Sequence, residues 1–203
     1  MTHAIWGLFN QGSQPGKTYM NPVFYHVLPS PVGDLTLVSN GEALTGVYMS
    51  DQKRGPDMDP TWQRDEAEFD AVTKQLTAYF VGDLREFDLP LAPQGTDFQK
   101  KVWRELCRIP CGETISYGEL ARRIGQPSAS RAVGLANGRN PIGIIIPCHR
   151  VIGADGTLTG YGGGLDRKKW LLEHEKLTGS RSALRSLFKE DSRTTRASAR
   201  ATP

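Results

Sequence analysis

Three adjacent residues, Cys148, His149 and Arg150, combine a nucleophile with a base and a cation. A cysteine reacts as its thiolate, and neighbouring cations raise the thiolate fraction whereas apolar surroundings lower it. Consecutive side chains in an extended segment point to opposite faces, so His149 reaches the sulfur only if the backbone turns there or a water molecule bridges the two. The three residues alone therefore fit a nucleophilic cysteine and a buried structural thiol equally well.

The chain that leads to this cysteine is apolar and ends abruptly. Residues 142–146 read IGIII, and Pro147 follows them. A short apolar run between turn-forming residues predicts a buried strand or a tight buried segment, which proline ends. The glycines of GYGGG, residues 160–164, lack the spacing of a nucleotide-binding loop. We interpret them as a pliable wall of a pocket that faces the thiol.

Two short helices are expected before this segment. Ser116 and Glu119 have the spacing of a capping box, and Ser128 is placed to cap a second helix that ends at Asn137 and Gly138. Two short arginine-containing helices across a glycine-containing turn fit either a DNA-binding helix-turn-helix or an ordinary helical hairpin. The pattern by itself favours the hairpin.

The earlier part of the chain reads as a sheet followed by a helix. Residues 22–49 alternate apolar and polar side chains between tight turns, which predicts two or three antiparallel strands. Residues 65–81 carry apolar side chains at helical spacing and predict an amphipathic helix. After a proline-containing linker at 89–95, Thr96 and Gln99 have capping-box spacing and predict the start of a further buried helix.

These patterns predict an α/β (α+β) protein in three parts. Residues 1–92 form an N-terminal domain with an antiparallel sheet and a flanking helix, residues 93–178 form a mostly helical domain, and residues 179–203 form a disordered basic tail. The second domain ends in a helix that begins at Asp166. Its expected buried side consists of Trp170, Leu171, His174 and Leu177.

Charge is distributed unevenly along the chain. Residues 1–92 carry 6 Lys or Arg against 12 Asp or Glu, whereas residues 93–178 carry 13 against 8 and residues 179–203 carry 6 against 2. A polyanionic partner would prefer the second half. Uneven surface charge without any partner is the alternative that the composition leaves open.

Composition also bears on compartment and metals. The three cysteines, Cys107, Cys111 and Cys148, cannot all pair, so we expect a reducing compartment, cytoplasmic or, in a eukaryote, nuclear. Pro110 separates Cys107 from Cys111 and no further His or Cys pair completes a zinc set, so we expect no metal site. No apolar run approaches the roughly 20 residues of a membrane helix, and we expect no membrane association.

Residues 147–150 read PCHR, and they are preceded by an Asn-Pro pair with an aliphatic run and followed by GYGGG and WLLEHE. Together with ISYGELA at 115–121 and RAVG at 131–134, this set resembles the O6-alkylguanine-DNA alkyltransferases, also called methylated-DNA–protein-cysteine methyltransferases. The resemblance covers about residues 90–178, and the part before them less specifically. It implies a ribonuclease-H-like first domain and a winged-helix-like helix-turn-helix in the second.

The resemblance implies irreversible transfer of an alkyl group from O6-alkylguanine, and from O4-alkylthymine, in double-stranded DNA to Cys148 after base flipping. Glu175 would orient His149, which would remove the Cys148 proton through a water molecule. The resulting thioether is stable and no second thiol is placed to take the group, so each molecule would act once. Neither a cofactor nor an obligate protein partner is implied, and we expect a monomer, with cooperative binding to DNA left open.

The resemblance also implies roles for residues around the DNA. Arg131 would enter the base stack in place of the flipped guanine, and Tyr117 would help to rotate the phosphate of the target nucleotide. Small residues of the same helix would permit close approach to the backbone of the DNA: Ala129, Ala132 and Gly134.

The implied pocket surrounds the acceptor thiol. Tyr161 and the backbone N–H of Gly162 would lie near the purine N3 and O6 atoms, and the Val151 carbonyl would accept from the exocyclic amine. Asn140 would be the hinge between the helix-turn-helix and the active-site segment, and Pro147 would close that segment.

Two other functions compete with this interpretation. One is a protein that recognises alkylated DNA without transferring the alkyl group, but relatives of that kind lack the acceptor cysteine and Cys148 is present. The other is a Cys-His-Glu hydrolase with a basic surface, which would turn over and would not depend on Arg131.

Overall fold

The computed structural model describes residues 22–52, 55–56 and 58–178. The first half contains a sheet of four strands, β1 (Phe24–Leu28), β2 (Leu35–Ser39), β3 (Leu44–Met49) and β4 (Gln63–Arg64), in the order β3-β2-β1-β4. Strands β1, β2 and β3 are antiparallel, as predicted, whereas the short β4 pairs parallel to β1 and was not foreseen. The expected basic tail, residues 179–203, lies outside the described residues.

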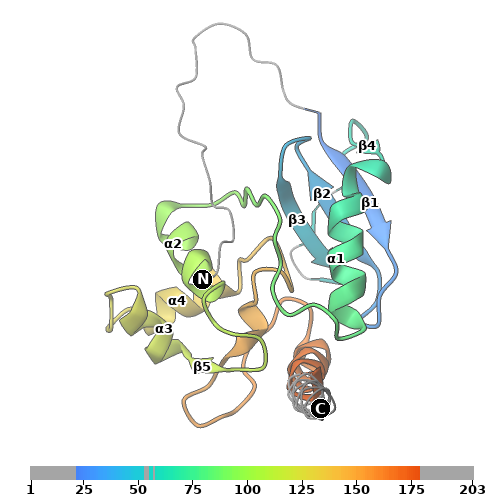
Figure 1. Ribbon diagram of the computed structural model, residues 1–203. Coiled ribbons are helices and arrows are strands. Elements are labelled where there is room, and N and C mark those ends of the chain that lie inside the picture. Colours follow the sequence, from blue (N-terminus) through green and yellow to red (C-terminus); the bar gives the residue numbers. More distant parts are fainter. Residues whose placement is uncertain (1–21, 53–54, 57, 179–203) are drawn as a thin grey trace, which may run out of the picture.

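One helix covers a face of this sheet (Figure 1). Helix α1 (Asp70–Phe80) follows a 3-10 turn, η1 (Ala67–Phe69), and buries Val72, Leu76 and Tyr79 at helical spacing. The prediction of an amphipathic helix is confirmed, although regular α-helix begins five residues later than the predicted residue 65. Asp65 delays it, because its carboxylate accepts the backbone N–H of Ala67 and thereby starts the preceding turn.

The second half is mostly helical. It contains α2 (Asp97–Leu106), α3 (Tyr117–Arg123), α4 (Ser130–Asn137) and a helix over residues 165–178, with β5 (Ile115–Ser116) paired parallel to β6 (Val151–Ile152). The structure thus has the expected mixed α+β composition, with the sheet first and the helices after it. No helix among the described residues is long and apolar enough to cross a bilayer.

Local capping explains where two of these helices start. The capping box at Thr96 is complete, since Thr96 Oγ1 accepts from Gln99 N at 3.3 Å and Gln99 Oε1 accepts from Thr96 N at 2.8 Å. Ser116 caps α3 by accepting from Glu119 N at 3.1 Å. The predicted cap at Ser128 is wrong: α4 begins after Ala129 without any side-chain cap.

The helix over residues 165–178 turns an unexpected side inward. Leu177 was expected on the buried side but is 67% exposed. The residues of this helix that are buried are Lys168, Leu171, Glu175 and Thr178. Two charged side chains therefore occupy a face that hydrophobic spacing could not identify.

The free edge of β3 joins the two halves. Leu44 N donates to Pro90 O and Ala92 N donates to Leu44 O, both at 2.9 Å, so the predicted linker adds to the sheet edge. Further along β3, Val47 pairs with Ile142, the first residue of the apolar segment before Cys148. Because an uncovered edge strand offers unpaired backbone groups, these pairings satisfy the edge and fix the segment that carries the thiol.

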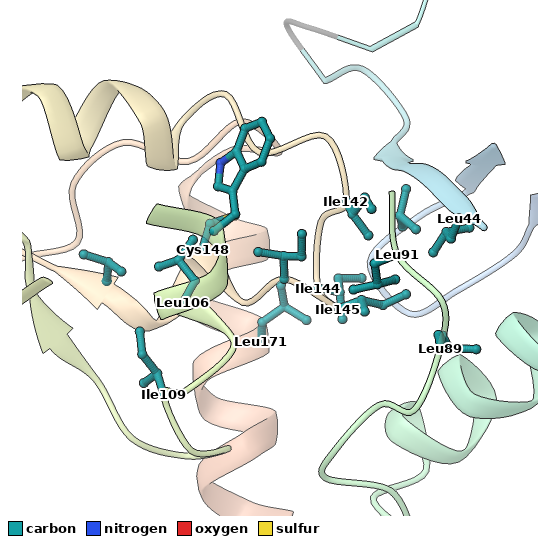
Figure 2. Packing of buried hydrophobic residues seen from close by; sticks show 14 of the residues in the cluster. Leu44, Leu89, Leu91, Leu106, Ile109, Ile142, Ile144, Ile145, Cys148 and Leu171 are labelled. Carbon is teal, nitrogen blue, oxygen red and sulfur yellow. The ribbon is translucent and has the colours of Figure 1, made fainter. Parts of the chain in front are cut away.

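A continuous hydrophobic core crosses this junction. Figure 2 shows Leu44, Leu89 and Leu91 from the first half beside Ile142, Ile144 and Ile145, with Leu106, Ile109 and Leu171 further along. The active-site segment is thus packed from both sides.

The apolar segment 142–146 is a tight turn and not a strand. Ile145 N donates to Gly143 O at 2.7 Å and Ile146 N to Ile142 O at 3.1 Å. Ile144 has a φ of 67°, a left-handed conformation that is unfavourable for a β-branched residue. Complete burial of its side chain offsets that cost, which is of order 1–3 kcal/mol.

Candidate active site

Cys148, His149 and Arg150 form a single 3-10 turn, η2, directly after Pro147. Arg150 N donates to Pro147 O at 3.0 Å, which closes the turn. Successive side chains in such a turn diverge by about 120°, so they do not lie on opposite faces as in a strand. The backbone turn that the cysteine and histidine need in order to cooperate is present.

Two asparagines hold this turn from behind. Asn140 Nδ2 donates to Ile146 O at 2.7 Å and to Ile142 O at 3.3 Å, and its Oδ1 accepts from Ile142 N at 3.0 Å. Asn137, at the end of α4, donates to the Cys148 carbonyl at 3.2 Å. Asn140 thus lies buried between α4 and the thiol and fixes the backbone of the segment before Cys148. Asn137 is a second support that was not foreseen.

Glu175 is the centre of a buried hydrogen-bond cluster. Its Oε1 accepts from His149 Nε2 at 2.9 Å, from Arg150 Nη2 at 2.8 Å and from the Tyr79 hydroxyl at 2.9 Å. Its Oε2 accepts from Arg150 Nε at 2.9 Å and from Gly112 N at 3.0 Å. The carboxylate is fully buried and has a fixed cationic partner in Arg150.

The electrostatics of the cluster favour a neutral histidine beside an ionised glutamate. Burial alone raises the pKa of the Glu175 carboxyl, but hydrogen bonds and charge from His149 and Arg150 outweigh it and hold that pKa well below its usual range. Burial lowers the pKa of His149, against the opposing effect of Glu175. Since Arg150 already balances the carboxylate, the imidazole remains neutral at pH 7.

A neutral His149 has one ring nitrogen left to act as a base. Its Nε2 donates to Glu175, which leaves Nδ1 as the acceptor. Nδ1 is buried and has no hydrogen-bond partner within the part of the chain that the structure describes. Burial raises the pKa of the Cys148 thiol, although an Asn140 hydrogen bond and the Lys168 charge act against it. The thiol is therefore protonated at neutral pH and needs such a base.

Cys148 opens onto a small pocket. The glycine loop forms one wall and α4 with its following residues forms another, and the lining residues are Gln52, Asn137, Gly138, Asn140, Gly143, Cys148, Gly160, Tyr161, Gly162 and Gly163. The Tyr161 ring meets the His149 ring edge to face, with centroids 6.5 Å apart. Burial raises the pKa of the Tyr161 phenol well above its usual value, so the hydroxyl is a hydrogen-bond donor.

Two expected pocket residues lie outside this lining. The Val151 carbonyl accepts from Lys168 Nζ at 2.7 Å, and Lys168 also donates to Thr159 O at 2.7 Å. Pro147 lines a separate cavity of about 380 Å³ behind the turn, together with Arg150. Both residues flank the thiol without lining its pocket.

Besides Asn137, sequence reasoning missed Lys168, Gln52 and Tyr79 as residues of the site. Lys168 follows Arg167 in a run of basic residues that resembles a solvated helix face, yet it is fully buried. Gln52 and Tyr79 come from the first half of the chain, where no chemistry was expected. The helical spacing of Tyr79 predicted its burial but contained no information about what its hydroxyl would meet.

The predicted DNA-contacting residues lie together on α3 and α4. Arg131 and Ala132 are exposed on α4, and Ala129 and Gly134 are half-buried. A side-chain carbon on Gly134 would lie 3.6 Å from the ring of Tyr117, at the start of α3. The Tyr117 hydroxyl donates to Thr159 O at 3.4 Å, which places this surface next to the glycine loop of the pocket.

The cluster contains no grouping typical of a metal centre. In the described ranges, no three His, Cys, Asp or Glu side chains gather in a way that could hold a metal ion. The chemistry available from the described side chains is proton transfer to His149 and nucleophilic attack by Cys148.

Comparisons with known proteins agree in both halves of the chain. The family model described as 6-O-methylguanine DNA methyltransferase, ribonuclease-like domain, matches residues 23–93, and the model of the DNA binding domain of the same family matches residues 97–177. The methylated-DNA–protein-cysteine methyltransferase of Mycobacterium tuberculosis is 55% identical over 76% of this chain and 93% of its own length. The protein of that name from Methanosarcina mazei is 51% identical over 76% and 98%.

Solved structures are similar over the same region. A crystal structure of Mycobacterium tuberculosis OGT in complex with DNA superposes with a TM-score of 0.72 at 54% identity, covering 76% of this chain and 94% of that one. The O6-methylguanine-DNA methyltransferase of Pyrococcus kodakaraensis superposes with a TM-score of 0.52 at 26% identity, covering 75% and 98%.

Proposed function

We infer the activity of this chain from its membership of the 6-O-methylguanine DNA methyltransferase family, to which both halves belong. Its function is direct-reversal DNA repair, as a methylated-DNA–protein-cysteine methyltransferase, and DNA is its partner. The chain has three cysteines, Cys107, Cys111 and Cys148, and the geometry of the site bears on which of them accepts the alkyl group, how it is activated and how the base reaches it.

We propose that Cys148 is the acceptor. The bond from Sγ to the alkyl carbon forms as the bond from that carbon to O6 breaks, and the electron pair of the broken bond stays on the guanine. The thiol proton passes to His149 Nδ1 through a bridging water. The leaving guanine anion accepts a hydrogen bond from the Tyr161 hydroxyl and then takes up a proton from solvent. The observation that carries this proposal is the buried, unpartnered Nδ1 of His149 one residue from a thiol that lines the pocket.

The target base has to leave the duplex to reach a pocket of this kind. We propose that Arg131 fills the vacated position in the stack and that Tyr117 contacts the backbone of the rotated nucleotide. The exposure of Arg131 and Ala132 on α4, and the contact between Tyr117 and Thr159 beside the pocket loop, support this arrangement. The small side chains at Ala129, Ala132 and Gly134 leave room for the sugar-phosphate backbone.

The proposed lesions are O6-alkylguanine and, by the same displacement, O4-alkylthymine. We propose that the protein acts as a monomer. A thioether at Cys148 has no described thiol beside it in the pocket lining to receive the group. Each molecule is therefore consumed by one transfer.

Intact-protein mass spectrometry tests the proposal directly. Protein and duplex DNA containing one O6-methylguanine are mixed in equal amounts, with Cys148→Ser as the matched variant. We expect a gain of one methylene, located on Cys148 by peptide mapping and absent from the variant. Lesion-specific binding without a mass gain would assign the protein to recognition alone, and multiple turnover of an ester substrate would support a hydrolase.

A further inference from the structure

We propose that Tyr79, on the helix of the first half, is a positioning residue for the transfer: through its hydrogen bond to Glu175 it sets the basicity of His149. The rate of alkyl transfer thereby depends on how α1 is docked. This inference rests on the proposed role of Cys148 as acceptor and His149 as base.

Tyr79 contacts the proton relay directly, because it bonds to the same Glu175 oxygen as His149. Its hydroxyl lies 2.9 Å from Glu175 Oε1, and this oxygen also accepts from His149 Nε2 at 2.9 Å. Tyr79 is 1% exposed and both partners are fully buried, so water does not replace the contact. Burial raises the pKa of the Tyr79 phenol well above its usual value, and the hydroxyl is therefore the donor and the carboxylate oxygen the acceptor.

The ring of Tyr79 is held independently of its hydroxyl. It packs against Phe80 and Phe87 with centroids 5.4 Å from each, and against His174 at 5.3 Å. The Tyr79 carbonyl also lies 2.8 Å from His174 Nε2. Phenylalanine at this position keeps these contacts and removes a single donor, which separates the effect of the hydroxyl from that of packing.

Removal of the Tyr79 hydroxyl should raise the pKa of His149, because the two groups share Glu175 Oε1. Three donors divide the negative charge of Oε1, and removal of the hydroxyl leaves more of that charge facing His149. A more basic carboxylate stabilises the imidazolium and raises the pKa of His149. Less neutral histidine is then available at a given pH, and transfer slows on the acid side of its profile.

Other ionisable groups surround the pair and remain unchanged by the substitution. They come from the turn itself, from the loop after α2, from the pocket loop and from the helix over residues 165–178: Cys148, Arg150, Cys111, Tyr161, Lys168 and His174. Because the replacement removes only a neutral donor, a change in the pH profile reports the Tyr79 contact and not a change in net charge.

The experiment measures single-turnover transfer to Cys148 as a function of pH in the full chain. Tyr79→Phe is compared with wild type and with Tyr25→Phe, a tyrosine of β1 that packs on Trp62 away from the cluster. We expect the acid limb of the pH–rate profile of Tyr79→Phe to shift to higher pH by on the order of one pH unit. Affinity for lesion-containing DNA and the Tyr25→Phe profile should remain as in wild type.

Direct titration of the His149 ring by NMR gives a second, activity-free measurement. A higher His149 pKa in Tyr79→Phe confirms the coupling, and identical ring titrations with coincident profiles overturn it. If Tyr79→Phe only melts earlier while its profile stays in place, the hydroxyl is purely structural and the proposal is wrong. Absence of transfer in wild type would instead refute the assignment of Cys148, independently of Tyr79.

Discussion

At the scale of single residues, the active site depends on how one buried carboxylate is balanced. Glu175 accepts two hydrogen bonds from Arg150 and one from His149. A lone buried carboxylate is strongly disfavoured, so Arg150 stabilises the charge and leaves the imidazole neutral and able to accept a proton. The arginine that follows the Cys-His pair thus acts on the carboxylate, and its effect on the thiol is indirect.

Glu175→Gln tests this balance. The amide keeps the volume but leaves Arg150 buried without its anion and turns a donor toward the Gly112 or Arg150 N–H groups. We expect the free energy of unfolding to fall by about 3–5 kcal/mol, as measured by urea denaturation. Transfer to Cys148 should slow together with it. A stability loss below about 1 kcal/mol would contradict the role of Glu175 as a buried ionic centre.

The same variant has a defined pH signature. The folded-state pKa of Glu175 is depressed below its unfolded value of about 4.3. The unfolded chain then binds more protons than the folded chain, so this group stabilises the fold above pH 4.3 and loses that contribution as the pH falls through and below this value. Wild type should therefore lose more stability than Glu175→Gln over that acid range.

At the scale of elements, α3 and α4 differ in how they begin. Ser116 accepts from Glu119 N at the start of α3, whereas α4 starts without a side-chain cap although Ser128 stands just before it. The difference is positional: helix α4 begins after Ala129, so Ser128 lies one residue too early to act as its cap. Spacing in the sequence located both helices but not this boundary.

A matched pair of substitutions distinguishes the two serines. Ser116→Ala should lower the free energy of unfolding by about 1 kcal/mol, because one backbone donor of α3 loses its partner. Ser128→Ala, at an exposed position, should change it by less than about 0.5 kcal/mol. Both are read from chemical denaturation, and equal losses would show that Ser128 caps α4 after all.

At the scale of the whole molecule, the sheet fixes the active-site segment, while α3 and α4 of the second half carry the proposed DNA-contacting surface. Val47 of β3 pairs with Ile142, and α1 reaches Glu175 through Tyr79. Arg131, in contrast, is exposed on α4 and belongs neither to the buried cluster nor to the pocket lining. Docking of DNA and chemistry at the thiol are therefore separable.

Arg131→Ala should separate them experimentally. On duplex DNA containing O6-methylguanine, we expect transfer to slow by at least tenfold, corresponding to about 1.4 kcal/mol, since the vacated stack position loses its planar cation. On the free O6-methylguanine base, which needs no flipping, the rate should match wild type. Both rates are measured by mass spectrometry. Equal slowing on the two substrates would place Arg131 in the chemical step and contradict its proposed role.

Local signals in the sequence determined several features of this protein. The complete capping box at Thr96 and the buried stripe of α1 depend on neighbours within a few residues, and the three antiparallel strands are consecutive in the chain and joined by short turns. The motif PCHR, with its flanks, was sufficient to identify the family. In the run before it, composition predicted burial, but the left-handed backbone of Ile144 and the resulting turn depend on packing from both halves.

Only the tertiary structure decided which distant groups complete the site. Tyr79 and Glu175 are 96 residues apart, and the hydrogen bond between them exists because α1 and the helix over residues 165–178 pack together. Lys168 and Glu175 are charged residues on a buried helix face, which hydrophobic periodicity assigns to solvent. Periodicity predicts which apolar side chains face the core, whereas the burial of a charged side chain and the identity of its partner are determined by long-range packing, and the chemistry of this site depends on those partners.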